Sequence, residues 1–364
     1  MRNEVGSFFE EEEFPDQEKT WWTDMVGQRE ALYTASGREA IELAIIAAES
    51  SHSDLRKVCL LPQYTCDTVI IPFQKHNWEI CFYPVDISLE IRAEILEDLL
   101  NRVNPGLLLM HTYFGTDTIK GVRHLIADYQ RERGLVFVED MTQSLALLLQ
   151  VQGADYYVGS LRKWFAIPDG GFILGKNLIQ PEYFREKSAF VERKMLAQRL
   201  KADYLQEKGA VSKEEFLRIN REAEDYLYQD DSICKMSEFS YKSMQRLDGK
   251  QQLRQREKNG VVLSKQLQKC KSIRAMIEMR GQSPLYLPIL TEHREWLQEL
   301  LKECDIFAPV LWPIPKEVEE TMTQDVRYIF EHMLALPCDH RYSEGDMCQI
   351  GEVLLEYEER CKSL

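Results

Sequence analysis

Short apolar runs alternate with helix-prone stretches over the first half of the chain, and this alternation strongly constrains the fold. The runs are 58–61, 80–83, 107–110, 135–138 and 172–174, and the stretches between them lie at about 65–76, 92–103 and 117–132. Strands that are apolar throughout are typical of a parallel sheet with helices on both faces. The sequence therefore predicts an α/β fold with a mostly parallel central sheet.

The pattern changes after Gly175, which indicates how the chain is organised. Residues 181–229 are charged and helix-prone without a strand-like run, so we expect a helical insert at about 176–230. The C-terminal part combines helices with a few extended runs, as a small α+β domain does. The expected parts are an N-terminal acidic segment at 1–25, a large domain at 26–245 that includes the insert, and a smaller C-terminal domain at 246–364.

The composition argues against several classes of function. Lys and Arg total 45 and Asp and Glu total 60, and the net charge of −15 disfavours binding to nucleic acid or to an anionic membrane. The nine scattered cysteines form no CxxC pair and the histidines lack metal-ligand spacing, so we expect reduced thiols and no metal site. The chain shows no signal-peptide pattern and no apolar run of the ~20 residues that cross a bilayer, which predicts a cytoplasmic protein.

Two polar motifs follow the buried strands in chain order. Glu139 and Asp140 follow the apolar run 135–138, and in an open α/β sheet a carboxylate at this place faces the crevice where ligands bind. A Ser-x-x-Lys pair, Ser160 and Lys163, comes next and is followed by the segment PDGG at 168–171. The same pair occurs in serine β-lactamases, but the SDN and KTG motifs of those enzymes are absent from this sequence.

The order of these residues suits pyridoxal 5′-phosphate (PLP). The phosphate of PLP can bind a helix N-terminus, here residues 36–38 (SGR), with a further hydroxyl from Ser160. The aldehyde needs a lysine amine, Lys163, to form a Schiff base. The pyridine nitrogen needs a buried carboxylate, Asp140, to stay protonated. We therefore predict a PLP enzyme in which Lys163 and Asp140 are catalytic.

These segments resemble the DegT/DnrJ/StrS-type sugar aminotransferases, a family of the fold-type I, aspartate-aminotransferase-like PLP enzymes. The resemblance covers about residues 30–364, apart from 176–230, and implies the fold-type I PLP transferase fold. It rests on five motifs in the family's order: 36–41 (SGREAI), 110–115 (MHTYFG), 139–143 (EDMTQ), Lys163 with 168–171 (PDGG), and 235–238 (KMSE) with 247–248 (LD) and 254–256 (RQR).

The resemblance implies a role for each matching residue. Lys163 would carry the Schiff base and shuttle a proton, and Asp140 would bind the pyridinium nitrogen. Gln143 would approach the ring hydroxyl. The backbone N–H groups of Gly37 and Arg38 would cradle the phosphate.

Other positions depart from the family or fit it loosely. The phosphate-loop Thr of the family is Arg38 here, and its phosphate-binding Ser lies five residues before the lysine, whereas Ser160 lies three before it. Tyr64 is a candidate to stack on the cofactor ring, with a buried core tyrosine as the alternative. His111 is expected either near the cofactor or in a structural role. Arg162 is a candidate to bind an anionic substrate, because its planar fork pairs with carboxylate or phosphate oxygens.

The resulting prediction is an aminotransferase that moves an amino group from glutamate or a similar donor to a keto group on a nucleotide-linked sugar. Its partners would be anionic small molecules and a second copy of the chain in a homodimer. A lyase, dehydratase or decarboxylase on the same scaffold remains open, as does a non-catalytic PLP-fold subunit. A dinucleotide-binding oxidoreductase is disfavoured because no GxGxxG follows the first strand.

Overall fold

The computed structural model of the protein describes residues 4–182, 184–207 and 211–362. The chain divides into two compact units, and each unit is assembled from segments far apart in the sequence. Unit 1 comprises Met1–Ser7, Asp54–Asp155 and Lys250–Leu364, and unit 2 comprises Phe8–Ser53 and Tyr156–Gly249. The domain limits predicted from the sequence, after residues 25 and 245, remain predictions.

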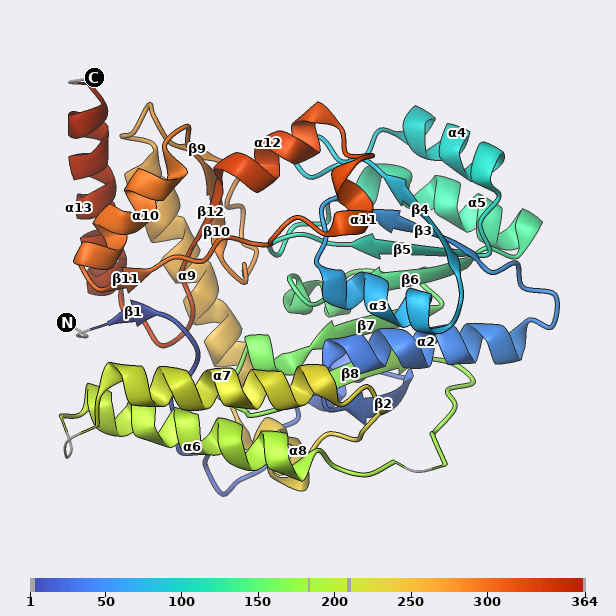
Figure 1. The fold of residues 1–364 in the computed structure, drawn as a ribbon, viewed down its shortest axis with the longest axis horizontal. Coiled ribbons are helices and arrows are strands. Elements are labelled where there is room, and N and C mark those ends of the chain that lie inside the picture. The colour runs from blue at the N-terminus through green and yellow to red at the C-terminus, as the bar shows by residue number, and fades with distance from the viewer. Residues whose placement is uncertain (1–3, 183, 208–210, 363–364) are drawn as a thin grey trace. The chain divides into compact units, whose positions relative to one another are not determined.

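Unit 1 contains four parallel strands in the order β6-β5-β3-β4 (Figure 1). They are β3 (Val58–Pro62), β4 (Glu79–Tyr83), β5 (Leu107–His111) and β6 (Val136–Asp140). Every residue of β3, β5 and β6 is buried, which accounts for the apolar runs that predicted these strands. The register pairs His111 with Asp140 at the carboxyl ends of β5 and β6, so two polar residues meet at one edge of the sheet.

The helices of this part of unit 1 agree with the predicted stretches. They are α3 (Asp67–Lys75), α4 (Ala93–Val103) and α5 (Arg123–Arg133), with the short 3₁₀ helices η1 (Lys120–Val122) and η2 (Leu145–Leu149). The buried side of α4 is formed by leucines at helical spacing, Leu96, Leu99 and Leu100, as expected for an amphipathic helix. The remaining face of α4 is charged.

The C-terminal segment of unit 1 adds a small antiparallel sheet of order β12-β10-β9, and β1 pairs with β11 in parallel. One continuous hydrophobic cluster joins these elements to the parallel strands of the same unit. The elements are β1 (Val5–Gly6), α9 (Gly249–Leu267), β9 (Arg274–Ala275), β10 (Leu287–Leu290), α10 (Arg294–Glu303), β11 (Ile306–Phe307), α11 (Lys316–Glu319), α12 (Gln324–His332), β12 (Met333–Leu336) and α13 (Glu344–Cys361).

Unit 2 contains three antiparallel strands in the order β2-β8-β7. The strands are β2 (Glu30–Thr34), β7 (Tyr156–Ser160) and β8 (Gly171–Gly175), and the helices are α1 (Trp21–Val26), α2 (Gly37–Ser51), η3 (Leu161–Lys163), α6 (Ser188–Leu205), α7 (Lys213–Gln229) and α8 (Glu238–Arg246). Helix α2 packs on β7 and β8 through its apolar face. The predicted apolar run at 172–174 is thus a strand of an antiparallel group.

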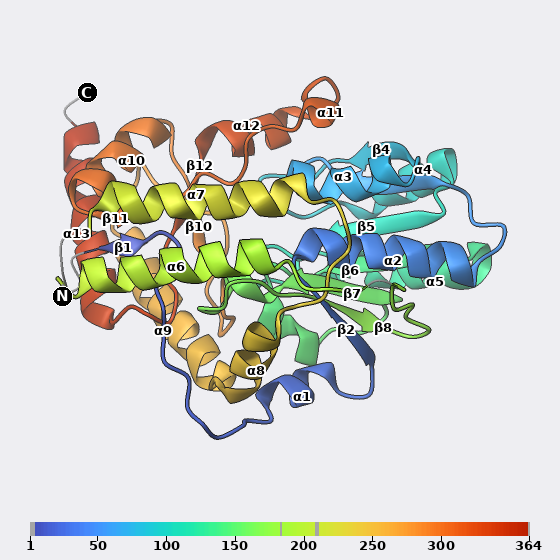
Figure 2. The same cartoon turned by 60° about the horizontal axis from the view of Figure 1, so that its bottom comes forward.

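The helical insert expected at about 176–230 is a pair of helices, α6 and α7, that lie side by side in both views (Figures 1 and 2). Phe190 and Val191 of α6 pack against Ala223 and Leu227 of α7. Within the described ranges, no helix combines the length and the apolar character that a membrane-spanning helix needs. The described part of the chain also contains no group of three or more His, Cys, Asp and Glu residues placed to hold a metal ion.

Candidate active site

The N-terminus of α2 in unit 2 offers an anion-binding position. Ser36 is the N-cap, and its hydroxyl accepts a hydrogen bond from the backbone N–H of Glu39. The first N–H groups of a helix have no carbonyl partner within it and lie at the positive end of its dipole. In α2, a helix of 15 residues, these are the N–H groups of Gly37 and Arg38. Such a terminus favours a phosphate or carboxylate ligand.

Gly37 and Ser160, both predicted to contact a phosphate, lie next to each other in unit 2. A Cβ added at Gly37 would be 3.3 Å from the Cβ of Ser160 and 3.5 Å from the carbonyl of Gly159. Any side chain at position 37 would therefore crowd the end of β7. The glycine keeps the backbone of the α2 N-terminus accessible beside the Ser160 hydroxyl.

The lysine predicted to be catalytic lies on a tight turn directly after β7. Lys163 is the last residue of η3, and its side chain is exposed, whereas Leu161 and Trp164 on either side are buried. The turn is fixed to the PDGG segment because the backbone N–H of Leu161 donates to the carbonyl of Gly170 at 2.8 Å. The buried side chains of Leu161 and Trp164 thus hold the turn in place, whereas the Lys163 side chain is exposed to solvent.

The second glycine of the PDGG segment allows two chain segments of unit 2 to approach closely. A Cβ added at Gly171 would lie 2.2 Å from the carbonyl oxygen of Ser36, a distance that no side chain tolerates. Asp169, at the start of the same segment, is fully buried and accepts hydrogen bonds from the hydroxyl (2.7 Å) and the N–H (2.8 Å) of Ser237. The segment therefore has a structural role in placing η3 and the α2 N-terminus.

Asp140 in unit 1 is a buried carboxylate with fixed partners. Its Oδ2 lies 3.1 Å from Nδ1 of His111, and its Oδ1 accepts a hydrogen bond of 2.8 Å from the N–H of Thr142. Burial raises the pKa of Asp140, but the hydrogen bonds and charge of His111 and the bonds from Thr142 outweigh burial, so the pKa is lowered. The side chain is consequently a carboxylate at neutral pH.

The chain of polar contacts continues beyond Asp140. Nε2 of His111 lies 2.9 Å from the hydroxyl of Thr65, and both residues are buried. Nδ1 of His111 therefore faces Asp140 and Nε2 faces Thr65, so both ring nitrogens have a polar partner and the ring is held in one orientation. Sequence reasoning missed Thr65, although it follows Tyr64 directly after a buried strand.

Gln143 and Tyr64 are both engaged within unit 1. Oε1 of Gln143 accepts a hydrogen bond of 3.3 Å from the backbone N–H of Phe114. The Tyr64 hydroxyl donates to the carbonyl of Leu311, and burial raises the pKa of Tyr64 well above its usual value. Its ring packs 5.2 Å from that of Trp312 and close to two other aromatic rings. Tyr64 is thus packed as a core tyrosine, and a role in cofactor stacking remains a prediction.

Two arginines predicted near the cofactor direct their side chains to α7 in unit 2. The Arg38 guanidinium donates to the carbonyl of Leu227 at 2.7 Å, near the C-terminus of α7, where a cation is favourable. Its carbon lies 5.7 Å from the centre of the Tyr228 ring. The Arg162 guanidinium forms an ion pair of 3.0 Å with Glu224. Of Arg38, only the backbone N–H remains a candidate to contact a phosphate.

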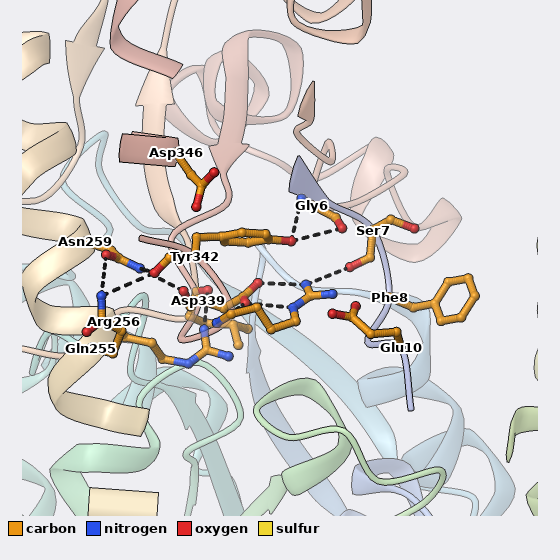
Figure 3. Close-up of polar contacts among 12 residues, drawn as sticks. Gly6, Ser7, Phe8, Glu10, Gln255, Arg256, Asn259, Asp339, Tyr342 and Asp346 are labelled. Carbon is orange, nitrogen blue, oxygen red and sulfur yellow. Dashed lines mark hydrogen bonds and ion pairs between the residues drawn. The ribbon is translucent and has the colours of Figure 1, made fainter. Parts of the chain in front are cut away.

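A second buried group of charges lies in the C-terminal part of unit 1 (Figure 3). Asp339 pairs with Arg341 through two bonds of 2.8 Å, and its backbone carbonyl accepts from Asn259. Burial raises the pKa of Asp339, but Arg341 and Arg256 outweigh this and lower it. The buried Arg256 donates to the carbonyl of Leu285 at 3.1 Å. These charged residues contribute to the packing of unit 1, and they place Arg256 near the buried carboxylate of Asp339.

Comparison with known proteins identifies the fold. No protein-family model matches the chain, and no curated protein matches it in sequence. Solved structures of aminotransferases, one of them described as a putative PLP-dependent aminotransferase, match it over nearly its whole length, which confirms the predicted fold-type I class.

Three of these structures illustrate the likeness. PseC of Helicobacter pylori, an aminotransferase involved in the biosynthesis of pseudoaminic acid, has a TM-score of 0.66 and 13% identity, over 96% of this chain and 94% of its own. A DegT DnrJ EryC1 StrS aminotransferase of Brucella abortus has a TM-score of 0.64 and 14% identity, over 93% and 88%. NtdA of Bacillus subtilis, with bound PMP, has a TM-score of 0.62 and 15% identity, over 95% and 78%. At such identity the likeness establishes the fold.

Proposed function

We propose that this protein is a PLP-dependent aminotransferase. The observation that carries the proposal is the buried Asp140, whose carboxylate is ionised and oriented by His111 and Thr142 at the end of β6. A buried carboxylate kept charged is the partner that a protonated pyridine nitrogen requires. The fold shared with aminotransferases, among them the sugar aminotransferase CalS13, supports the same conclusion.

The residues present in each unit fit PLP. Unit 2 supplies an exposed amine on a rigid turn, Lys163, and a phosphate cradle at the α2 N-terminus, where Gly37 leaves room beside Ser160. Unit 1 supplies the ionised Asp140 and the amide of Gln143. When bound, PLP supplies an electron sink that stabilises negative charge on the α-carbon of an amino acid.

Each residue then has a task that its position supports. The N–H groups at the start of α2 and the Ser160 hydroxyl would bind the phosphate. Asp140 would hold a proton on the ring nitrogen, with His111 and Thr65 keeping its carboxylate in one orientation. Nζ of Lys163 would hold the cofactor covalently and, once released, carry a proton from the α-carbon of the amino donor.

The substrates are proposed from the fold alone. The neighbours include PseC and other sugar aminotransferases, which favours a keto group on a nucleotide-linked sugar as the acceptor and glutamate or a similar anionic amino acid as the donor. We further propose a cytoplasmic homodimer. Sedimentation of the active protein at micromolar concentration tests the dimer, and an active monomer would contradict it.

The test of the function begins with cofactor binding. Purified protein mixed with PLP should turn yellow, and borohydride should bleach it and attach the pyridoxyl group to the peptide that contains Lys163. The variant Lys163→Ala should lose the colour and the turnover, whereas Lys176→Ala, which removes another exposed lysine of unit 2, should keep both. Glutamate added to the yellow protein should bleach it and release an equivalent of 2-oxoglutarate.

Two results would contradict the proposal. Transamination by Lys163→Ala would show that another group performs the reaction. Release of carbon dioxide or of an unsaturated product, instead of 2-oxo acid, would assign the chain to the decarboxylases or lyases with the same fold.

A further inference from the structure

The turn that carries Lys163 is attached to the α6–α7 helix pair through its middle residue. Arg162 precedes Lys163 in η3, and its guanidinium lies 3.0 Å from Oε1 of Glu224 on α7. The same guanidinium is 5.9 Å from the centre of the Phe190 ring on α6. Among the residues that the structure describes, Glu224 supplies the only ion pair of Arg162. All of these residues belong to unit 2.

Glu224 also binds a second cation. Its Oε1 accepts a bond of 2.7 Å from Nζ of Lys194 on α6, and Lys194 donates a further bond of 2.6 Å to Asn220. Burial lowers the pKa of Lys194, and Glu224 opposes that effect. Burial raises the pKa of Glu224, but Arg162 and Lys194 outweigh it and bring the pKa down to about 2. One carboxylate thus holds two cations that would otherwise repel each other.

The ion pair between Arg162 and Glu224 differs from an ordinary surface ion pair because it helps to hold η3 in position. The side chain of Arg162 is only 20% exposed, and the Nε atom of this residue is buried without a hydrogen-bond partner in the described structure. The backbone holds Arg162 weakly, because its N–H lies 3.4 Å from the Gly170 carbonyl, compared with 2.8 Å for Leu161. Without the charge of Glu224, the Arg162 guanidinium and the Lys194 ammonium would lose their common counter-ion, which disfavours the position that Arg162 now has in η3.

We propose that Glu224 is a positioning residue for Lys163, acting through Arg162 to hold η3 in the conformation that reacts with PLP. This inference rests on the proposed function. It assigns the α6–α7 pair a role in the site, as the support of the catalytic turn. It also gives Arg162 a positioning role in place of substrate binding.

The experiment compares Glu224→Gln with Glu222→Gln. Both residues lie on α7, both are about one-third exposed, and Glu222 also pairs with two cations, Arg193 and Arg218. Each substitution keeps the side-chain shape and removes one charge. The dissociation constant for PLP is measured from the visible absorbance, and hydrogen exchange of the segment 159–166 is measured in the cofactor-free protein.

We expect Glu224→Gln to raise the PLP dissociation constant about threefold to tenfold, which corresponds to about 0.7 to 1.4 kcal/mol. Exchange at the N–H groups of Leu161 and Trp164, both hydrogen-bonded in η3, should accelerate by a similar factor. Glu222→Gln should stay within about twofold of the wild-type protein in both measurements. Lys194→Met, which weakens the α6–α7 pair without removing the bond between Arg162 and Glu224, should bind PLP as the wild-type protein does.

A double-mutant cycle identifies the route of the effect. If Glu224 acts through Arg162, then Glu224→Gln should change PLP binding little in a background of Arg162→Met, because the partner is already lost. An equal effect in both backgrounds, or equal results for Glu224→Gln and Glu222→Gln, would overturn the inference and leave the proposed function intact. Failure of the wild-type protein to bind PLP through Lys163 would instead overturn the proposed function, and this inference with it.

Discussion

The substitution Glu39→Gln should remove a pH-dependent part of the stability of the protein. Glu39 lies in the first turn of α2, and its side chain is 2% exposed. Its Oε2 accepts hydrogen bonds from the N–H groups of Ala35 (3.1 Å) and Cys234 (3.2 Å), and its Oε1 lies 3.6 Å from Nζ of Lys187. Burial raises the pKa from 4.5 to about 7, although Lys187 and the backbone bonds pull it down.

The sign and size of the effect follow from this pKa. A carboxyl whose pKa is raised on folding contributes stability that is fully present below the unfolded value of 4.5 and is lost as pH rises through about 7. The loss between about pH 5 and pH 8 amounts to about 2 to 3 kcal/mol, because one pKa unit corresponds to about 1.4 kcal/mol. Gln does not ionise, so the variant should gain stability relative to the wild-type protein by this amount as the pH rises.

Urea unfolding followed by tryptophan fluorescence at several pH values measures the difference. The control Glu49→Gln removes the same charge further along α2, at a half-buried position. Its difference from the wild-type protein should change little with pH. If the difference between Glu39→Gln and the wild-type protein is also constant from about pH 5 to pH 8, then Glu39 does not ionise in this range and the reasoning is refuted.

Two further substitutions test the interactions of Glu139 and Asp140, the last two residues of β6. Arg123→Met should destabilise the protein by about 3 to 5 kcal/mol, because it removes the guanidinium that binds the buried Glu139 at 2.7 and 2.9 Å. Urea unfolding measures this change, and a decrease in the free energy of unfolding below about 1 kcal/mol would contradict the prediction. Asp140→Asn should retain PLP but lower the turnover number by about two or more orders of magnitude, because a neutral amide does not hold the pyridinium proton, and near-normal turnover would show that another acid has this role.

Local features of the sequence were sufficient to predict the candidate residues and many of the elements, although β2 and β7 were not among the predicted strands. Burial on both faces requires apolar side chains along a whole strand, so the runs of β3, β5 and β6 are visible without a structure. A helix N-terminus is also a local feature, and the one expected at residues 36–38 is the start of α2, with Ser36 as its N-cap. The order of the PLP-type motifs along the chain is likewise a property of the sequence. These patterns determined the fold class and the list of candidates, including Lys163 and Asp140.

Only the tertiary structure decided which partner each charged side chain takes. His111 and Asp140 meet because β5 and β6 are neighbours in register, and Arg162 meets Glu224 because α7 packs beside η3, 62 residues further along the chain. The grouping of Met1–Ser7 with Lys250–Leu364 in one unit is equally non-local. Hydrophobic periodicity encodes which face of an element is buried, but it carries no information about which distant element covers that face. For that reason Arg162 could be predicted near the cofactor from the sequence, whereas its attachment to α7 required the structure.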